Sequence, residues 1–133
     1  IGLNFGENAK SALISRSFAE IVRLGNILGA NSKTLFGLSG LGDLILTCNS
    51  LKSRNTSFGN LISSQPKIPI SEHLKSLDTT EGYFTVQAIH NIAQEKNINM
   101  PIADSIYRIL FEKVSIENEI KQLLQRPTKD EVY

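Results

Sequence analysis

The chain has 133 residues, 41% of them hydrophobic, which is enough for one domain with a sizeable core. Fourteen Lys and Arg residues nearly balance thirteen Asp and Glu residues, and a net charge of +1 gives no reason to expect a nucleic-acid or membrane partner. One Cys cannot form an internal disulfide, no apolar run approaches the ~20 residues of a membrane span, and no signal-peptide pattern is present.

The first periodic segment runs from Ala9 to Leu28. Its apolar positions recur at steps of three and four residues, which predicts a helix with one buried face. We expect Asn8 to cap this helix and Gly29 to end it. Gly25 inside it costs about 1 kcal/mol relative to Ala, so it predicts a close crossing by a neighbouring helix.

The next stretch, residues 37–55, holds most of the polar chemistry. Ser32 is expected to cap a short helix before it. Within it three glycines precede Asp43 and an apolar run that ends at Thr47. On a helix these two polar residues are four apart, so they lie on one face. The stretch closes on Ser53, Arg54 and Asn55, followed by apolar residues at helical spacing, which predicts a helix N-terminus there.

The second half of the chain predicts three further helices and a short one. Ser71 is expected to cap a short helix that ends at Leu77, and residues 78–82 (DTTEG) are expected to break the pattern before a longer helix. Residues 97–101 predict an extended link, because the residue before a proline avoids the helical region. Ser115 is expected to cap the last helix and Pro127 to end it, which leaves a polar tail. No segment alternates with period two, so the fold class predicted is all-α.

Several reactive or charged side chains have simpler interpretations. Lys10 and Arg16 are expected to be solvated surface cations. Cys48 has no second Cys or suitably spaced His beside it, so it is interpreted as a buried structural thiol. His90 is expected to have a packing or surface role. No metal site is predicted.

The residues around Asp43 allow two interpretations. One carboxylate, one guanidinium, two hydroxyls, an amide and a helix N-terminus suit a small anionic, hydroxylated ligand such as a sugar or polyol phosphate. Alternatively, Asp43 and Arg54 form an ordinary ion pair and the glycines only allow close packing. Composition and spacing alone favour the second interpretation.

Four motifs in the same order carry a resemblance to a known family. They are GLSGLGDLILTC, the SRN that follows it, EGYFTVQAI and NMPIADSIYRIL. Together they resemble the C-terminal domain of NAD(P)-dependent glycerol-3-phosphate dehydrogenase, over a range from about Gly2 to about Leu110. The resemblance implies that residues 1–133 are a helical substrate-binding domain, like the C-terminal domain of 6-phosphogluconate dehydrogenase.

The resemblance also implies roles for single residues. Asp43 would lie near the reacting end of glycerol 3-phosphate or dihydroxyacetone phosphate, and Thr47 would line the same pocket. Ser53, Arg54 and Asn55 would bind the substrate, chiefly through its phosphate. Contacts to the NAD or NADP cofactor would come from Arg54, Thr79 and Glu81.

Two parts of the family's machinery are missing from these residues. No glycine-rich GxGxxG unit follows a strand, so the Rossmann domain that binds most of the cofactor is expected upstream. The family's acid/base lysine belongs to a motif just before Ile1, and Lys10 does not match it. No catalytic residue is therefore expected here, and the chain is interpreted as a piece of a longer protein that is inactive alone.

Three functional hypotheses remain. The first is the substrate-binding domain of a cytoplasmic glycerol-3-phosphate dehydrogenase that supplies glycerophospholipid synthesis. Its partners would be the phosphate substrate and its own N-terminal Rossmann domain, with a homodimer left open. The second is a helical interaction module, or inactive relic, that kept the fold and lost the chemistry. The third is the second domain of a related hydroxy-acid dehydrogenase, against which the SRN after GLGDLILTC argues.

Overall fold

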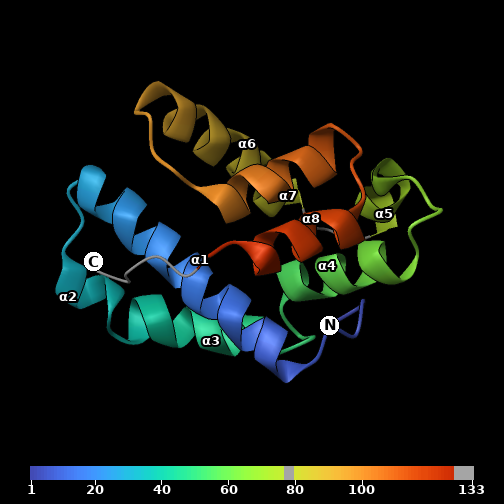
Figure 1. Ribbon diagram of the computed structural model, residues 1–133, viewed down its shortest axis with the longest axis horizontal. Coiled ribbons are helices and arrows are strands. Elements are labelled where there is room, and N and C mark those ends of the chain that lie inside the picture. The colour runs from blue at the N-terminus through green and yellow to red at the C-terminus, as the bar shows by residue number, and fades with distance from the viewer. Residues whose placement is uncertain (77–79, 128–133) are drawn as a thin grey trace.

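A computed structural model describes residues 1–76 and 80–127 of the chain. Within them the chain forms helices and no strand, so the prediction of an all-α fold is confirmed (Figure 1). No helix in these two ranges combines the length and apolarity needed to cross a membrane. The elements are α1 (Glu7–Ile27), α2 (Ser32–Leu35), the π-helical turn η1 (Leu38–Gly42), α3 (Asp43–Cys48), α4 (Arg54–Ser64), α5 (Ile70–Ser76), α6 (Thr80–Glu95), α7 (Pro101–Phe111) and α8 (Ile116–Gln125).

The longest helix, α1, crosses the molecule and separates two groups of helices. Figure 1 shows α2 and α3 along one side of it and α6 and α7 on the other. Phe18 and Val22 of α1 are buried, and Phe18 meets Phe36 edge to face at 5.0 Å. The main cluster of buried apolar residues lies between α1, α6 and α7 and contains Ala93, Ile98 and Met100. The buried face that the three- and four-residue spacing predicts is confirmed at Phe18, whereas Ile21 and Leu28 are exposed.

The two ends of α1 agree with the sequence prediction only in part. The helix begins at Glu7 after Gly6, whose φ of 89° falls in a region that glycine adopts readily, so Asn8 lies inside the first turn and the prediction that it caps the helix is wrong. The predicted end is confirmed, since Gly29 follows the helix with φ of 80°. An ideal Cβ on Gly25 would lie 2.6 Å from Leu35 Cδ1, which confirms a close crossing there, by α2.

The sequence predicts caps at Ser32, Ser71 and Ser115 and a helix N-terminus at residues 53–55, and the structure confirms the cap at Ser115 and the helix start at residues 53–55. Ser53 Oγ accepts a hydrogen bond from Thr56 N, and Ser115 Oγ accepts one from Asn118 N. The cap predictions for Ser32 and Ser71 are wrong, by one residue for α2 and by two for α5. The cap of α2 is Asn31, whose side chain accepts from Lys33 N, and α5 already begins at Ile70 after Pro69, which places Ser71 inside it.

The predicted break at residues 78–82 is wrong for its second half. Thr80, Glu81 and Gly82 form the first turn of α6, while residues 78 and 79 lie outside the described part. The link before α7 and the helices that follow it are confirmed, with Pro101 as the first residue of α7, where its missing N–H costs nothing.

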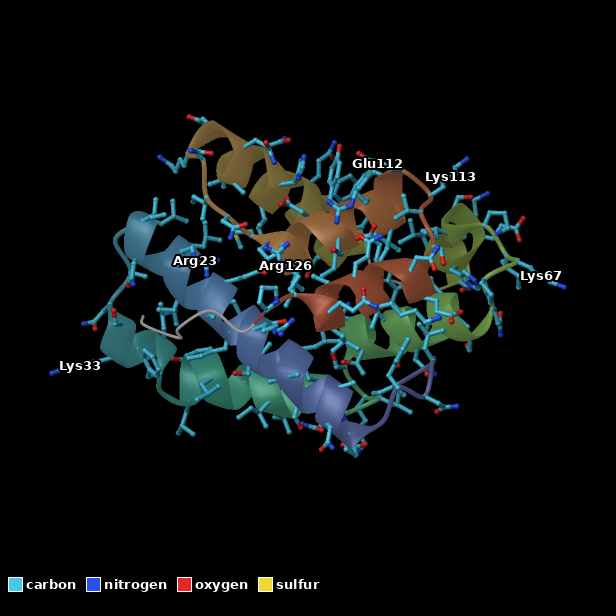
Figure 2. The ribbon with its side chains drawn as sticks, in the orientation of Figure 1. Arg23, Lys33, Lys67, Glu112, Lys113 and Arg126 are labelled. Carbon is cyan, nitrogen blue, oxygen red and sulfur yellow. The ribbon has the colours of Figure 1, made fainter. Side chains whose placement is uncertain are left out.

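Charged side chains on the surface are spread over the molecule. Figure 2 shows Lys33 and Lys67 projecting from opposite ends, and both are exposed. Arg16 is an exception to its expected role as a solvated cation. Its guanidinium donates hydrogen bonds to the backbone oxygens of Leu123 and Arg126, which ties α1 to the end of α8. That prediction is therefore wrong for Arg16.

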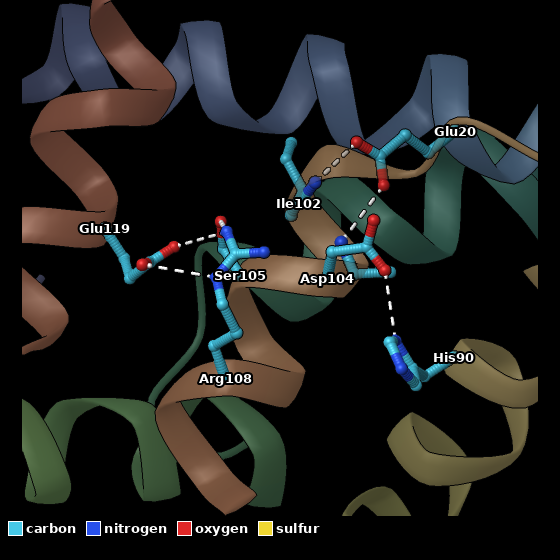
Figure 3. A network of polar contacts seen from close by, with 8 residues as sticks. Glu20, His90, Ile102, Asp104, Ser105, Arg108 and Glu119 are labelled. Carbon is cyan, nitrogen blue, oxygen red and sulfur yellow. Dashed lines mark hydrogen bonds and ion pairs between the residues drawn. The ribbon is translucent and has the colours of Figure 1, made fainter. Parts of the chain in front are cut away.

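A polar network holds α7 between its neighbours (Figure 3). Glu20 of α1, only 5% exposed, accepts from Ile102 N at 2.7 Å and from Ala103 N at 3.1 Å. Since the first N–H groups of a helix have no partner within it, this carboxylate acts as a cap supplied from a distant helix. Burial raises the pKa of Glu20, and the two backbone hydrogen bonds oppose that rise.

The other end of the network is an ion pair. Arg108 of α7 donates to Glu119 of α8 through Nε at 3.3 Å and through Nη2 at 2.7 Å, and it also reaches Ser105 Oγ at 3.1 Å. The hydrogen bond from Arg108 lowers the pKa of Glu119, and the same bond raises the pKa of Arg108. This fork-shaped pair fixes α8 against α7.

Candidate functional site

The predicted site follows two short helical elements, α2 and the π-helical turn η1, which lead into α3. Gly40 of η1 comes so close to α2 that an ideal Cβ would lie 2.0 Å from the backbone oxygen of Leu35. Only a glycine allows this approach, so the packing interpretation is correct for Gly40. The close approach sets the start of α3, which begins at Asp43 directly after Gly42.

Asp43 and Thr47 lie one turn apart on α3. Asp43 is exposed in the first turn of the helix, and Thr47 is half-buried near its end. The hydroxyl of Thr56 on α4 donates to the backbone oxygen of Thr47 at 2.6 Å. The end of α3 is thereby tied to the first turn of α4, which brings the backbone of Thr47 and the start of α4 together.

The start of α4 presents the remaining polar groups. Ser53 Oγ caps the helix by accepting from Thr56 N at 3.4 Å, and Arg54 and Asn55 are the first two helical residues. Both are exposed. A capped N-terminus with a guanidinium and an amide beside it can bind a phosphate monoester through charge-assisted hydrogen bonds.

The first turn of α6 meets the start of α4. An ideal Cβ on Gly82 would lie 2.6 Å from Asn55 Oδ1, so the amide of Asn55 lies directly against the α6 backbone. Glu81, the neighbour of Gly82, is exposed. The structure therefore brings the predicted cofactor residue Glu81 close to the predicted substrate residue Asn55. Thr79 lies outside the described residues.

The alternative of an Asp43–Arg54 ion pair finds no support in the described part of the chain. The ion pairs found there include Lys10 with Glu7, His90 with Asp104, Arg108 with Glu119 and Lys121 with Glu117, and none found there joins Asp43 to Arg54. No group of three or more His, Cys, Asp or Glu that could hold a metal ion is found within residues 1–76 and 80–127.

A cleft of about 470 Å³ lies elsewhere, between α1 and α3. Leu41 of η1, Ile45 of α3 and Asn49, which follows α3, line it, whereas Asp43 and Thr47 do not. Lys10 lines the cleft from α1, and its side chain is only 22% exposed, so the prediction that it is a solvated cation is wrong. The cleft is therefore separate from the predicted site.

Two residues interpreted as structural have surroundings that suit such roles. Cys48 is half-buried, and its loss of contact with water raises the pKa of the thiol. The ring of His90 stacks on Tyr107 at 3.7 Å, and its Nδ1 lies 3.1 Å from Asp104 Oδ1. These contacts join α6 to α7 within the network of Figure 3.

Sequence reasoning missed two residues of this architecture. Gly82 was interpreted only as part of a break, although a glycine directly after Glu81 is a hint that something approaches the backbone there. Glu20 was not singled out, and no local signal indicates it, because a residue two positions from both Phe18 and Val22 lies on another face of the helix.

Comparisons with known proteins agree on one family. A family model described as "NAD-dependent glycerol-3-phosphate dehydrogenase C-terminus" matches residues 1–121. The chain is 46% identical over 134 residues to glycerol-3-phosphate dehydrogenase (NAD(P)+) of Lactobacillus helveticus, which covers 99% of this chain and 39% of that protein. It is also 46% identical over 132 residues to the enzyme of the same name from Oceanobacillus iheyensis, covering 98% and 38%.

A solved structure gives the same result. The crystal structure of glycerol-3-phosphate dehydrogenase from Coxiella burnetii superimposes with a TM-score of 0.88 at 36% sequence identity. The match covers 94% of this chain and 38% of that one. The chain thus spans well under half the length of the proteins that it matches.

Proposed function

Because the chain belongs to the NAD-dependent glycerol-3-phosphate dehydrogenase family, whose C-terminal domain it matches, we propose that it is the substrate-binding domain of such an enzyme. The enzyme would interconvert sn-glycerol 3-phosphate and dihydroxyacetone phosphate in the cytoplasm and supply glycerophospholipid synthesis. The domain would work with an N-terminal Rossmann domain that provides most of the cofactor site and the acid/base lysine.

The start of α4 carries this proposal. Ser53 caps the helix, Arg54 and Asn55 are exposed beside that cap, and Thr56 ties the turn to Thr47. A phosphate monoester is multiply charged near neutral pH, and a guanidinium matches two of its oxygens at once. Asp43, one turn from Thr47, would accept hydrogen bonds from the hydroxyls at the other end of the substrate.

The cofactor NAD or NADP would accept or donate the hydride. Among the described residues, Arg54 and Glu81 fit such a group in their chemistry, since a guanidinium pairs with phosphate and a carboxylate accepts from ribose hydroxyls. Both are exposed and so can contact a group that another domain holds. The interaction-module hypothesis needs none of these groups, whereas the proposed function uses each of them.

Substitution of Arg54 tests the proposal. In the full-length dehydrogenase we expect Arg54→Ala to raise the KM for glycerol 3-phosphate about 100-fold, because charge-assisted hydrogen bonds contribute roughly 1.5–3 kcal/mol each. Arg54→Lys should be intermediate, since lysine keeps the charge and loses the planar fork. Steady-state kinetics and thermal melting are measured on the same proteins.

The matched control is Lys52→Ala, which removes an exposed cation two residues away. This variant should leave the KM unchanged. A fall in the melting temperature of Arg54→Ala together with an unchanged KM would show that Arg54 is a structural residue, and the proposal would then be wrong.

A further inference from the structure

The amide of Asn55 occupies the space that a side chain at position 82 would need. An ideal Cβ on Gly82 would lie 2.6 Å from Asn55 Oδ1, 3.5 Å from its Cγ and 4.0 Å from its Nδ2. The first of these distances is well inside ordinary van der Waals contact, so an alanine at position 82 and the present position of the Asn55 amide exclude each other.

The backbone does not explain why position 82 is a glycine. Gly82 is the third residue of α6, and its φ is not in the left-handed region that favours glycine. Alanine is the better residue in a helix on conformational grounds. What the glycine at position 82 provides is therefore space for the side chain of Asn55.

We propose that Gly82 is a positioning residue for substrate binding, acting through Asn55. This inference rests on the proposed function, in which Asn55 binds a polyol phosphate. The terminal torsion of an asparagine is broad, so its amide presents a donor and an acceptor in a fixed direction only when its surroundings restrict it. The α6 backbone at Gly82 restricts the Asn55 amide on one side.

The same contact connects the two halves of the proposed site. Glu81, the residue proposed to contact the cofactor, directly precedes Gly82, and Arg54 directly precedes Asn55. The contact between Gly82 and Asn55 thus sets the spacing between the substrate residues of α4 and the cofactor residue of α6. A misplacement of about 1 Å in a binding group can reduce catalysis 100-fold.

The test is Gly82→Ala in the full-length dehydrogenase, with Gly59→Ala as the control. Gly59 lies within α4, and an ideal Cβ there has nothing within 4 Å. We expect Gly82→Ala to raise the KM for glycerol 3-phosphate about 10-fold or more without lowering the melting temperature. Gly59→Ala should leave the KM unchanged. An unchanged KM in Gly82→Ala would overturn the inference.

A double-mutant cycle with Asn55→Ala separates positioning from a structural role. Once the Asn55 amide is gone, Gly82→Ala should have no further effect on the KM. If Gly82→Ala lowers the melting temperature or raises the KM equally in both backgrounds, Gly82 does not act through Asn55 and the inference is wrong. If Asn55→Ala and Arg54→Ala both leave the KM unchanged, the proposed function itself fails.

Discussion

At the scale of single residues, the buried carboxylates Glu20 and Glu119 respond to acid in opposite directions. The pKa of Glu119 is lowered by its hydrogen bond with Arg108, so its contribution to stability is present above the pKa of the unfolded chain and is lost as the pH falls through the folded pKa. The pKa of Glu20 is raised by burial, so its contribution is largest at low pH and declines as the pH rises.

We expect Glu119→Gln to lower the free energy of unfolding by about 1–2 kcal/mol at pH 7. A larger loss of stability is not expected, because the side chain of Arg108 is 38% exposed and solvent screens the ion pair. Because Glu119 becomes protonated as the pH falls through its lowered pKa, the difference between wild type and variant should shrink in acid. Urea unfolding at several pH values measures both effects.

The control for this prediction is Glu117→Gln. This change removes a second carboxylate of α8, one that pairs with Lys121 of the same helix. Glu117 and Lys121 are each more than half exposed, so this surface pair should contribute little. Equal losses in the two variants at pH 7 would contradict the role given to the Arg108–Glu119 pair.

At the scale of elements, the junction from α2 to α3 depends on one glycine. An alanine at position 40 would place its Cβ 2.0 Å from the Leu35 backbone oxygen, and backbone cannot move aside as a side chain can. We expect Gly40→Ala to lower the free energy of unfolding by about 2–3 kcal/mol, the cost typical of overpacking. Thermal melting measures the loss.

Gly42→Ala is the comparison for this element. An ideal Cβ on Gly42 meets Leu38 Cδ2 at 3.5 Å, an ordinary contact, and the residue already has helical dihedral angles. This variant should be neutral or slightly stabilising. A loss as large as that of Gly40→Ala would mean that the whole π-helical turn, and not the approach to Leu35, requires glycine.

At the scale of the whole molecule, helical spacing in the sequence was enough to predict the fold class and the main helices. Apolar residues at steps of three and four located α1, and polar residues ahead of apolar-periodic runs located the starts of α4 and α8, because these features act within a few residues. The start of α2 was misplaced by one residue and that of α5 by two, since neighbouring polar residues compete for the cap position and a proline shifts the first turn.

Contacts between distant parts of the chain could not be predicted in this way. The bond from Ile102 N to Glu20 joins residues 82 apart, and the approach of Gly82 to Asn55 joins two separate helices. Neither leaves a periodic pattern in the sequence. For the same reason the polar groups near Asp43 were compatible with a ligand site and with simple packing until the resemblance to a family was considered.

The cap that Glu20 provides for α7 has a consequence for hydrogen exchange. Amide protons in the first turn of a helix usually exchange quickly with solvent, because they have no partner within the helix. The amides of Ile102 and Ala103 are bonded to a carboxylate that is only 5% exposed, so they should exchange as slowly as core amides. Their exchange would require α1 to separate from α7.

Glu20→Ala should therefore speed deuterium uptake at Ile102 and Ala103 by at least about tenfold, the factor expected for each 1.4 kcal/mol of lost protection. The amide of Thr56, which is capped locally by Ser53, should exchange at the same rate in both proteins. Slow exchange at Ile102 in the variant would show that α7 protects its own first turn. If exchange is fast in the variant, the amide protons of Ile102 and Ala103 in the wild-type protein report how often α1 separates from α7.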